Sequence, residues 1–404
     1  KSEIIHYFDH NYEIPDNTEW QPNDATLNYY YLQTANLRHN LGSMYKVNPS
    51  KQPSTFKKAL ESHKVIDREM AQTTILSYLY YDDGAVVYDA LPPKDRFKAK
   101  LNNSSYFPSH SMGKSITSYL IGHAICQGYI KSIDEPIHDW PLMESTLYYG
   151  QPLINLLNMK AGDSKVMNRK NHSAFAKTGR GIHGNAPLIR AAQNPLELKD
   201  TKPIKNPPYW YSNLAADILF NYMMHRVGND FDNFITDFYK SKIKIEHPVY
   251  LWMNPTTATV NSLSTKNRIR EGAGQYGISA TRYDFLRIAK AIMDDWQNDT
   301  CEGQYLKEIY DRRVRTQRKS LSWNSLEAND NHEFMDTSAK YGGQFWTDFH
   351  GLWNKNILVM VGYNGQQIAI DMDNSRIVVI SAVKSNHYNT KKLGYEPIKF
   401  GRIR

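Results

Sequence analysis

Runs of β-branched and aromatic residues predict strands in the first third of the chain. Residues 75–80 form such a run, residues 82–84 are a turn signal of the Asp-Asp-Gly type, and a second apolar run follows at 85–88. Two apolar runs joined by a short glycine-containing turn are typical of a β-hairpin. We therefore expect a hairpin over 73–90.

The same pattern returns near the other end of the chain. Apolar runs at 367–370 and 376–380 flank a turn signal at 373–375, and a further run at 357–361 comes just before them. These runs predict a second hairpin with a third strand preceding it.

Helical patterns occupy the middle of the chain. Segment 111–127 has apolar residues on more than one stripe and is followed by Gly128, a residue type that often ends helices, so we expect a helix buried on most sides. Segments 214–226 and 283–296 predict two further helices. A short helix is also expected at about 55–64, within a polar N-terminal part.

Strands from both ends that bracket a helical middle predict an α/β (α+β) fold. We expect an antiparallel sheet flanked by helices, with a mostly helical domain inserted into it. The expected units are an N-terminal arm or cap at 1–70, a sheet domain at 71–109 plus 271–404, and a helical domain at 110–270. The active site is expected between the last two units.

Composition permits a sizeable core and does not point to nucleic acid. Of the 404 residues, 41% are hydrophobic and 22% are charged, as in ordinary globular proteins. The formal net charge is +8, and the densest basic run is Arg312, Arg313, Arg315, Arg318 and Lys319. This run covers no single helical face, so we interpret it as solvated surface, with a polyanion site as the alternative.

The two cysteines leave the redox compartment open. Cys126 lies in an apolar segment and is expected to be a small buried hydrophobic residue. Cys126 and Cys301 cannot build a disulfide framework, although a single bridge between them stays possible. No run of about 18 apolar residues is present, so we predict no membrane span.

The first chemical motif is S-x-x-K, formed by Ser111 and Lys114. On a helix these two side chains share one face, where a lysine with a lowered pKa can take the proton that makes serine nucleophilic. Serine in the first helical turn also lies near free N–H groups that favour negative charge. The spacing alone occurs by chance, so it is a weak signal by itself.

Two further motifs follow the first. Tyr211 and Asn213 form a Y-x-N before a predicted helix: a phenol near an ammonium can relay protons, and an amide can hold a substrate carbonyl. Tyr363, Gly365 and Gln366 lie at the start of a predicted strand. There a glycine permits close approach of substrate, and the N–H of Gln366 can join that of Ser111 in an oxyanion hole.

In this order and spacing, the three motifs resemble those of the serine β-lactamase and penicillin-binding superfamily. The resemblance is closest to the class C-type branch, which includes esterases, D-aminopeptidases and 6-aminohexanoate-oligomer hydrolases. It covers about residues 70–385. Three other stretches contribute, namely 128–137, 154–162 (the family's "LLxMxSG" stretch) and a glycine-rich lead into a helix at 272–284.

The resemblance implies a catalytic role for each motif residue. Ser111 would attack the acyl carbon, Lys114 would take its proton, and Tyr211 would protonate the leaving group and later activate water. Asn213 would contact substrate and lysine, and the N–H groups of Ser111 and Gln366 would form the oxyanion hole.

One departure from the family narrows the expected activity. β-Lactamases and transpeptidases carry Lys or His where this chain has Tyr363, so a cation that would grip a substrate carboxylate is missing. The sequence thus favours an acyl-serine hydrolase acting on a small amide or ester, ahead of a D-peptidase or a β-lactamase. A non-catalytic sensor on the same fold is the rival from another class, and a nucleic-acid binder is a distant third.

Several residues keep a purely structural alternative. Asn213 could serve only as a helix N-cap, Tyr211 and Tyr363 could be packing residues, and His110 is expected to be a satisfied structural histidine. Trp210 and Trp346 could form apolar walls of an acyl pocket.

The remaining expectations concern cofactors, partners and location. We expect no metal and no cofactor, because the 14 histidines show no H-E-x-x-H or Cys/His ligand spacing. The expected partner is a small-molecule substrate, and the oligomeric state stays open. A periplasmic or secreted location is expected from family habit and from the first residue, Lys1, which suits a trimmed chain, although a cytoplasmic location stays possible.

Overall fold

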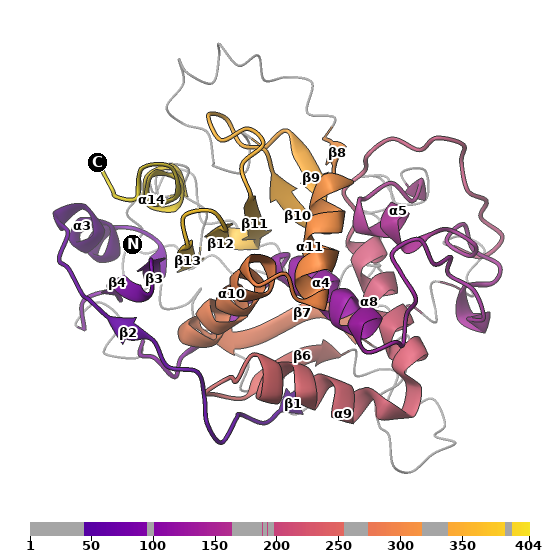
Figure 1. Ribbon diagram of the computed structural model, residues 1–404, viewed down its shortest axis with the longest axis horizontal. Helices are drawn as coiled ribbons and strands as arrows, with labels where there is room; N and C mark the ends of the chain where they lie inside the picture. The colour runs from indigo at the N-terminus through magenta and orange to yellow at the C-terminus, as the bar shows by residue number, and fades with distance from the viewer. Residues whose placement is uncertain are drawn as a thin grey trace, which may run out of the picture.

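The computed structural model describes residues 44–94, 101–163, 188, 192, 198–253, 274–316, 338–383 and 390–404. Its main feature is a nine-stranded sheet with the strand order β2-β4-β3-β13-β12-β11-β10-β9-β8 (Figure 1). Neighbouring strands run antiparallel except β2 and β4, which are parallel. The strands are β2 (Lys57–Lys58), β3 (Ile75–Asp82), β4 (Ala85–Ala90), β8 (Val314–Arg315), β9 (Lys340–Gly342), β10 (Phe345–Thr347), β11 (Ile357–Gly362), β12 (Gln366–Asp371) and β13 (Arg376–Ala382).

Both predicted hairpins are confirmed. The turn at Asp83 and Gly84 has positive φ at both residues, which suits a tight hairpin between β3 and β4. β12 and β13 form the second hairpin, and β11 is the predicted third strand beside it. The two hairpins join where β3 pairs with β13, so the centre of the sheet is built from distant parts of the chain.

A second, four-stranded sheet was not predicted from the sequence. Its order is β1-β6-β7-β5, with β1 (Tyr45–Val47), β5 (Tyr106–Pro108), β6 (Val249–Met253) and β7 (Gly274–Thr281). All of its pairings are antiparallel. β5 leads directly into the predicted nucleophile helix, so this sheet positions the residues that precede Ser111.

The predicted long helices are confirmed with small shifts of their ends. The main helices are α3 (Lys64–Gln72), α4 (Met112–Cys126), α5 (Leu153–Leu157), α8 (Asn213–Val227), α9 (Phe231–Thr236), α10 (Arg282–Gln297), α11 (Cys301–Asp311) and α14 (Glu396–Phe400). α4 is buried from Met112 to Ala124, as its apolar pattern predicts, and it contacts α8, α11, β7 and β11. In Figure 1 it passes behind α11 and points towards α8.

The helix expected at 55–64 is wrong. Residues there are extended: the N–H groups of Ala59 and Glu61 donate to the carbonyls of Val86 and Val87 beside β4. The helix begins only at Lys64, after His63 accepts a hydrogen bond from the next turn and caps it.

Cys126 is only partly buried, so the expectation of a buried hydrophobic residue is wrong, whereas the bridge to Cys301 that the sequence left possible is present. Cys126 at the end of α4 forms a disulfide with Cys301, the first residue of α11, and Cys301 is exposed. The bridge fixes the end of α4 to the beginning of α11.

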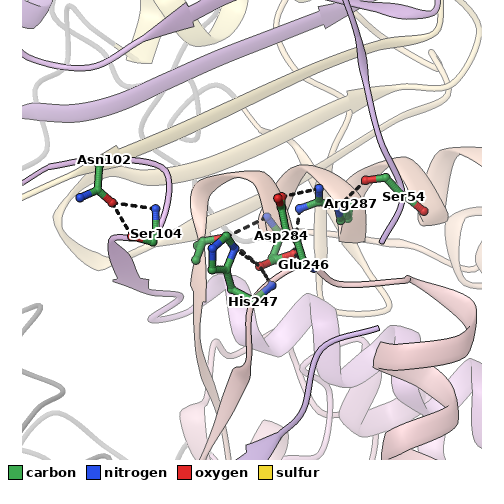
Figure 2. A network of polar contacts seen from close by, with 8 residues as sticks. Ser54, Asn102, Ser104, Glu246, His247, Asp284 and Arg287 are labelled. Carbon is green, nitrogen blue, oxygen red and sulfur yellow. Dashed lines mark hydrogen bonds and ion pairs between the residues drawn. The ribbon is translucent and has the colours of Figure 1, made fainter. Parts of the chain in front are cut away.

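A network of polar groups anchors the early part of the chain to α10 (Figure 2). The carboxylate of Asp284 accepts hydrogen bonds from the backbone N–H groups of Glu246 and His247, at 2.7 and 3.1 Å. Arg287 bonds Asp284 at 3.0 Å, the carboxylate of Glu246 at 2.7 Å and the carbonyl of Ser54 at 2.8 Å. Because Asp284 and the Arg287 side chain are buried, these bonds satisfy charges that would otherwise destabilise the fold.

Candidate active site

Ser111 lies at the junction between β5 and α4. Ser109, just before the junction, makes two hydrogen bonds with Ile278 of β7: its backbone N–H donates to the carbonyl of Ile278, and its side-chain Oγ accepts the N–H of Ile278. His110 then takes a left-handed conformation with φ of 46°, which turns the chain into the helix. Ser111 is the N-cap of α4 and makes no side-chain cap bond, so its hydroxyl is left for other partners.

The S-x-x-K spacing brings its two functional groups together. Nζ of Lys114 lies 2.8 Å from Oγ of Ser111, and Lys114 is fully buried. Burial lowers the pKa of Lys114 to about 7, against the opposing effect of the negative charge of Asp217. A lysine in this setting is neutral in part of the molecules near neutral pH and can accept the proton of Ser111.

Two phenol rings flank the lysine. Nζ of Lys114 lies 4.8 Å from the ring centroid of Tyr211 and 3.9 Å from that of Tyr276. Burial and the nearby charge of Asp217 raise the pKa of Tyr276 well above its usual range, while hydrogen bonding to Ser111 opposes the shift. Tyr276 therefore contacts both members of the Ser111–Lys114 pair, and sequence reasoning missed it. Tyr276 lies in the glycine-rich stretch at 272–284, but no motif in the sequence distinguishes it from its neighbours.

The Y-x-N segment is held by the stretch that resembles the family's "LLxMxSG". The N–H of Trp210 donates to the carbonyl of Met159 at 2.8 Å. Ser212 is the N-cap of α8, because its Oγ accepts the N–H of Ala215 at 3.3 Å. The interpretation of Asn213 as that N-cap is therefore wrong: Asn213 is the first residue of the helix.

A buried carboxylate supports the same segment. Asp163 accepts a hydrogen bond from the hydroxyl of Tyr148 at 2.8 Å and interacts with the side chain of Ser212. Because Ser212 stands between the two motif residues, Asp163 helps to fix the position of Tyr211.

Aromatic side chains surround Tyr211, which is 37% exposed and therefore not a core residue. Its ring stacks on Trp346, with centroids 5.7 Å apart and planes inclined by 23°. Tyr341 meets both rings edge-on. Trp346 is buried beside Tyr211, whereas Trp210 is partly buried.

The third motif lies beside the residues that precede Ser111. Tyr363–Gly365 form a short 3-10 turn between β11 and β12. Gly362, just before it, packs so closely on the carbonyl of Ser109 that a Cβ there would overlap it. Tyr363 is 51% exposed, which contradicts a plain packing role, and Gly365 has φ of 85°.

Gln366 offers only its backbone to a substrate. Its side chain is buried and its amide donates to the carbonyl of Ala382. Residue 366 begins β12, immediately after the turn that approaches Ser109.

His110 is not the satisfied structural histidine that we expected. Its Nε2 is buried and has no hydrogen-bond partner among the residues that the structure describes. The ring meets Trp252 and Tyr363 edge-on, with centroids 6.0 and 5.8 Å away. Burial, together with the charge of Lys114, lowers the pKa of His110 to about 4, so the imidazole is neutral at pH 7.

The described residues contain no group of three or more His, Cys, Asp or Glu side chains arranged to hold a metal ion. No described helix is both long enough and apolar enough to cross a membrane.

Solved structures of other proteins share the architecture of this chain. No protein-family model and no curated protein sequence matches the chain. Among solved structures, a Bacillus anthracis protein assigned as a 6-aminohexanoate-dimer hydrolase superimposes with a TM-score of 0.60 at 13% identity, over 97% of each chain. The octameric penicillin-binding protein homologue from Pyrococcus abyssi has a TM-score of 0.54 at 13% identity, over 81% of this chain and 73% of its own.

The chain has the fold of the serine β-lactamases and penicillin-binding proteins. A penicillin-binding protein from Bacillus halodurans agrees, with a TM-score of 0.52 at 13% identity, over 83% of this chain and 99% of its own. The predicted α/β fold is thereby confirmed, and it is the fold that the resemblance implied. α4, the helix that carries Lys114, contacts α8 on one side and β11 and β12 of the nine-stranded sheet on another.

Proposed function

We propose that the protein is an acyl-serine hydrolase that cleaves a small amide or ester through an acyl-enzyme on Ser111. The observation that carries the proposal is the 2.8 Å contact between Ser111 Oγ and the fully buried Nζ of Lys114. A buried amine with a pKa of about 7 is matched to proton transfer at neutral pH.

The reaction would proceed in two halves. In the first, Oγ of Ser111 bonds to the acyl carbon as its proton passes to Lys114, and the leaving amine or alcohol departs with a proton relayed through Tyr211. In the second, water attacks the acyl-enzyme, gives up a proton to the same groups and releases the acid and the free serine. The N–H groups of Ser111 and Gln366 would hold the oxyanion in both halves.

The walls of the site favour a substrate whose acyl part is uncharged. Tyr211, Trp346 and Tyr341 pack together beside Lys114, and Tyr363 stands where related enzymes carry a cation. Aromatic faces bind apolar and amide groups well but do not compensate a carboxylate. We therefore favour amides and carboxylesters with short linear acyl chains as substrates over penicillins and over peptides with a free carboxylate.

We also propose that the protein works in an exported, oxidising setting. The disulfide between Cys126 and Cys301 supports this, because such bridges persist mainly in periplasmic and extracellular proteins.

The test measures the hydrolysis of p-nitrophenyl butyrate and of the corresponding amide, butyryl p-nitroanilide. Both the initial burst of product and the steady-state rate are recorded. Wild type should turn over continuously, and Ser111→Ala should lose turnover. Ser104→Ala, an exposed serine outside the site, is the matched control and should keep wild-type rates. A stoichiometric burst without turnover would mean that the protein is a sensor and not a hydrolase. Equal rates in wild type and Ser111→Ala would overturn the proposal.

A further inference from the structure

Two polar residues interrupt the apolar sequence of α8. Asp217 and Asn221 follow Asn213 at intervals of four residues, so the three side chains share one face of the helix. Asn221 is fully buried and Asp217 is partly buried. Polar groups in such surroundings destabilise a fold unless they are hydrogen-bonded, so their partners indicate what they do.

Both side chains hold the beginning of β7. The N–H of Tyr276 donates to Oδ1 of Asp217 at 3.0 Å. Asn221 binds Gly274 twice: its Oδ1 accepts the N–H of Gly274 at 3.0 Å, and its Nδ2 donates to the carbonyl of Gly274 at 2.8 Å. α8 therefore helps to hold the start of β7 in place, together with the pairing of Gly274 and Met253 in the sheet.

The same three residues are wedged against the nucleophile helix. A Cβ on Gly113, within the S-x-x-K motif, would overlap the carbonyl of Tyr276. A Cβ on Gly274 would lie 2.5 Å from ring carbons of Phe220 on α8. The start of β7 therefore packs tightly between α4 and α8. The hydrogen bonds from Asp217 and Asn221 hold it there, with the centroid of the Tyr276 ring 3.9 Å from Nζ of Lys114.

Asp217 also acts on the lysine through its charge. Burial raises the pKa of Asp217 to about 7, while the N–H of Tyr276 and the charge of Lys114 oppose the shift. In the described parts of the chain, Lys114 interacts with four titratable groups. They are Asp217 from α8, His110 from the link between β5 and α4, and the phenols of Tyr276 and Tyr211. Asp217 is the carboxyl group of this set and carries a negative charge whenever it is ionised. His110, with its pKa lowered to about 4, is neutral at pH 7, and the raised pKa of Tyr276 keeps that phenol protonated.

We infer that Asp217 is a positioning residue for the Ser111–Lys114 pair: it anchors Tyr276 against Lys114 and supplies the negative charge that stabilises the lysine after it takes the serine proton. Its effect on rate rests on the proposed acyl-serine chemistry. Its effect on the protonation of Lys114 does not depend on that chemistry. The experiments below measure the effect on rate and the effect on protonation separately.

Three variants separate anchoring from charge. Asp217→Asn keeps an oxygen that can accept the N–H of Tyr276 but removes the charge. Asn221→Ala removes the anchor of Gly274 and leaves the charge, and Asp217→Ala removes both functions of Asp217. Asp294→Asn, an exposed carboxylate on α10 paired with Lys290, is the matched control for a change of net charge.

The first measurement follows protonation without any substrate. Protein labelled with 13C at the lysine ε-carbon is titrated by NMR, and the Lys114 signal is assigned by its absence in Lys114→Arg. Removing a nearby negative charge disfavours the ammonium, so the pKa of Lys114 should fall by about one unit in both Asp217 variants. It should stay at the wild-type value in Asn221→Ala and Asp294→Asn.

The second measurement is the pH profile of kcat for p-nitrophenyl butyrate. Asp217→Asn should shift the acid limb to lower pH by the same amount and lower the plateau about tenfold, with little change in KM, because a less basic lysine takes the proton less readily. Asn221→Ala should lower kcat without moving the limb.

A Lys114 titration that is identical in wild type and Asp217→Asn would overturn the inference, as would a shift of equal size in Asn221→Ala. Absence of Ser111-dependent turnover in the wild type would overturn the proposed function alone, because the NMR titration would still report on Asp217. If Asp217→Ala does not fold, the near-isosteric Asp217→Asn carries both measurements.

Discussion

The indole of Trp346 lies almost parallel to the phenol of Tyr211, with their centroids 5.7 Å apart. Tyr211 is more than one-third exposed, so the stack provides a packed surface for a ring that otherwise faces solvent. Trp346 belongs to β10 of the large sheet, whereas Tyr211 precedes α8. The stack therefore links β10 of the large sheet to the segment that precedes α8.

This relationship predicts that Trp346→Leu lowers kcat/KM for an ester substrate by about 10- to 100-fold, because a small displacement of a catalytic group has effects of that size. The matched control is Trp353→Leu, since Trp353 is 40% exposed and lies outside the site. Steady-state kinetics of the two variants give the comparison. Equal kcat/KM in both would mean that the stack does not position Tyr211.

The proton balance at Lys114 predicts a pH dependence with a definite sign. Lys114 accepts the serine proton only when neutral, so kcat/KM should rise with pH through a midpoint near the lysine pKa of about 7 and fall off below it. Asp217 also titrates near 7, so the measured midpoint belongs to the coupled pair. Rates measured from pH 5 to pH 9 on a substrate that does not itself titrate provide the test, and a flat profile would contradict the assignment of Lys114 as the base.

The close approach at Gly113 predicts that a single methyl group disrupts the site. In Gly113→Ala the new Cβ would overlap the backbone carbonyl of Tyr276, which cannot move aside as a side chain would. We expect a lower melting temperature and a loss of at least about 100-fold in kcat, because Tyr276 and Ser111 would be pushed apart. Met112→Leu, a volume-conserving change at the neighbouring buried position, should be nearly neutral in thermal melting and in kinetics.

The bridge between α4 and α11 predicts a redox-dependent stability. Cys126 and Cys301 are separated by 175 residues, and cross-linking a long loop removes much entropy from the unfolded chain. Replacing both cysteines with serine should lower the free energy of unfolding by roughly 2–5 kcal/mol and the melting temperature with it. Scanning calorimetry of the double variant and of the oxidised and reduced wild type measures the effect. Identical melting temperatures in all three would show that the bridge contributes nothing.

The features that the sequence predicts correctly are local ones. The apolar pattern of 111–127 reports burial on every side of one helix, and the strand–turn–strand pattern of 73–90 reports one hairpin. Ser111 and Lys114 come together because three residues along a helix always bring side chains to the same face. Each of these inferences depends on neighbours within a few residues.

The features that the sequence does not reveal depend on contacts between distant segments. β1 and β5 have three residues each, too few for a strand pattern, and they gain their identity only by pairing with β6 and β7. Tyr276 reaches the Ser111–Lys114 pair because α8 and α4 enclose the start of β7. The polar interruption of α8 at Asp217 was the one signal available in the sequence.

The pairing of β3 with β13 also has a consequence for biosynthesis. Tyr80 and Val378 are partners at the centre of the sheet, so a ribosome must synthesise most of the protein before the two strands can meet. Until then the β3–β4 hairpin presents an unpaired edge made of apolar residues, which is the kind of surface that chaperones bind and that drives aggregation. Long-range pairing of this kind also slows folding, so recombinant yield should improve when translation is slow or the temperature is low.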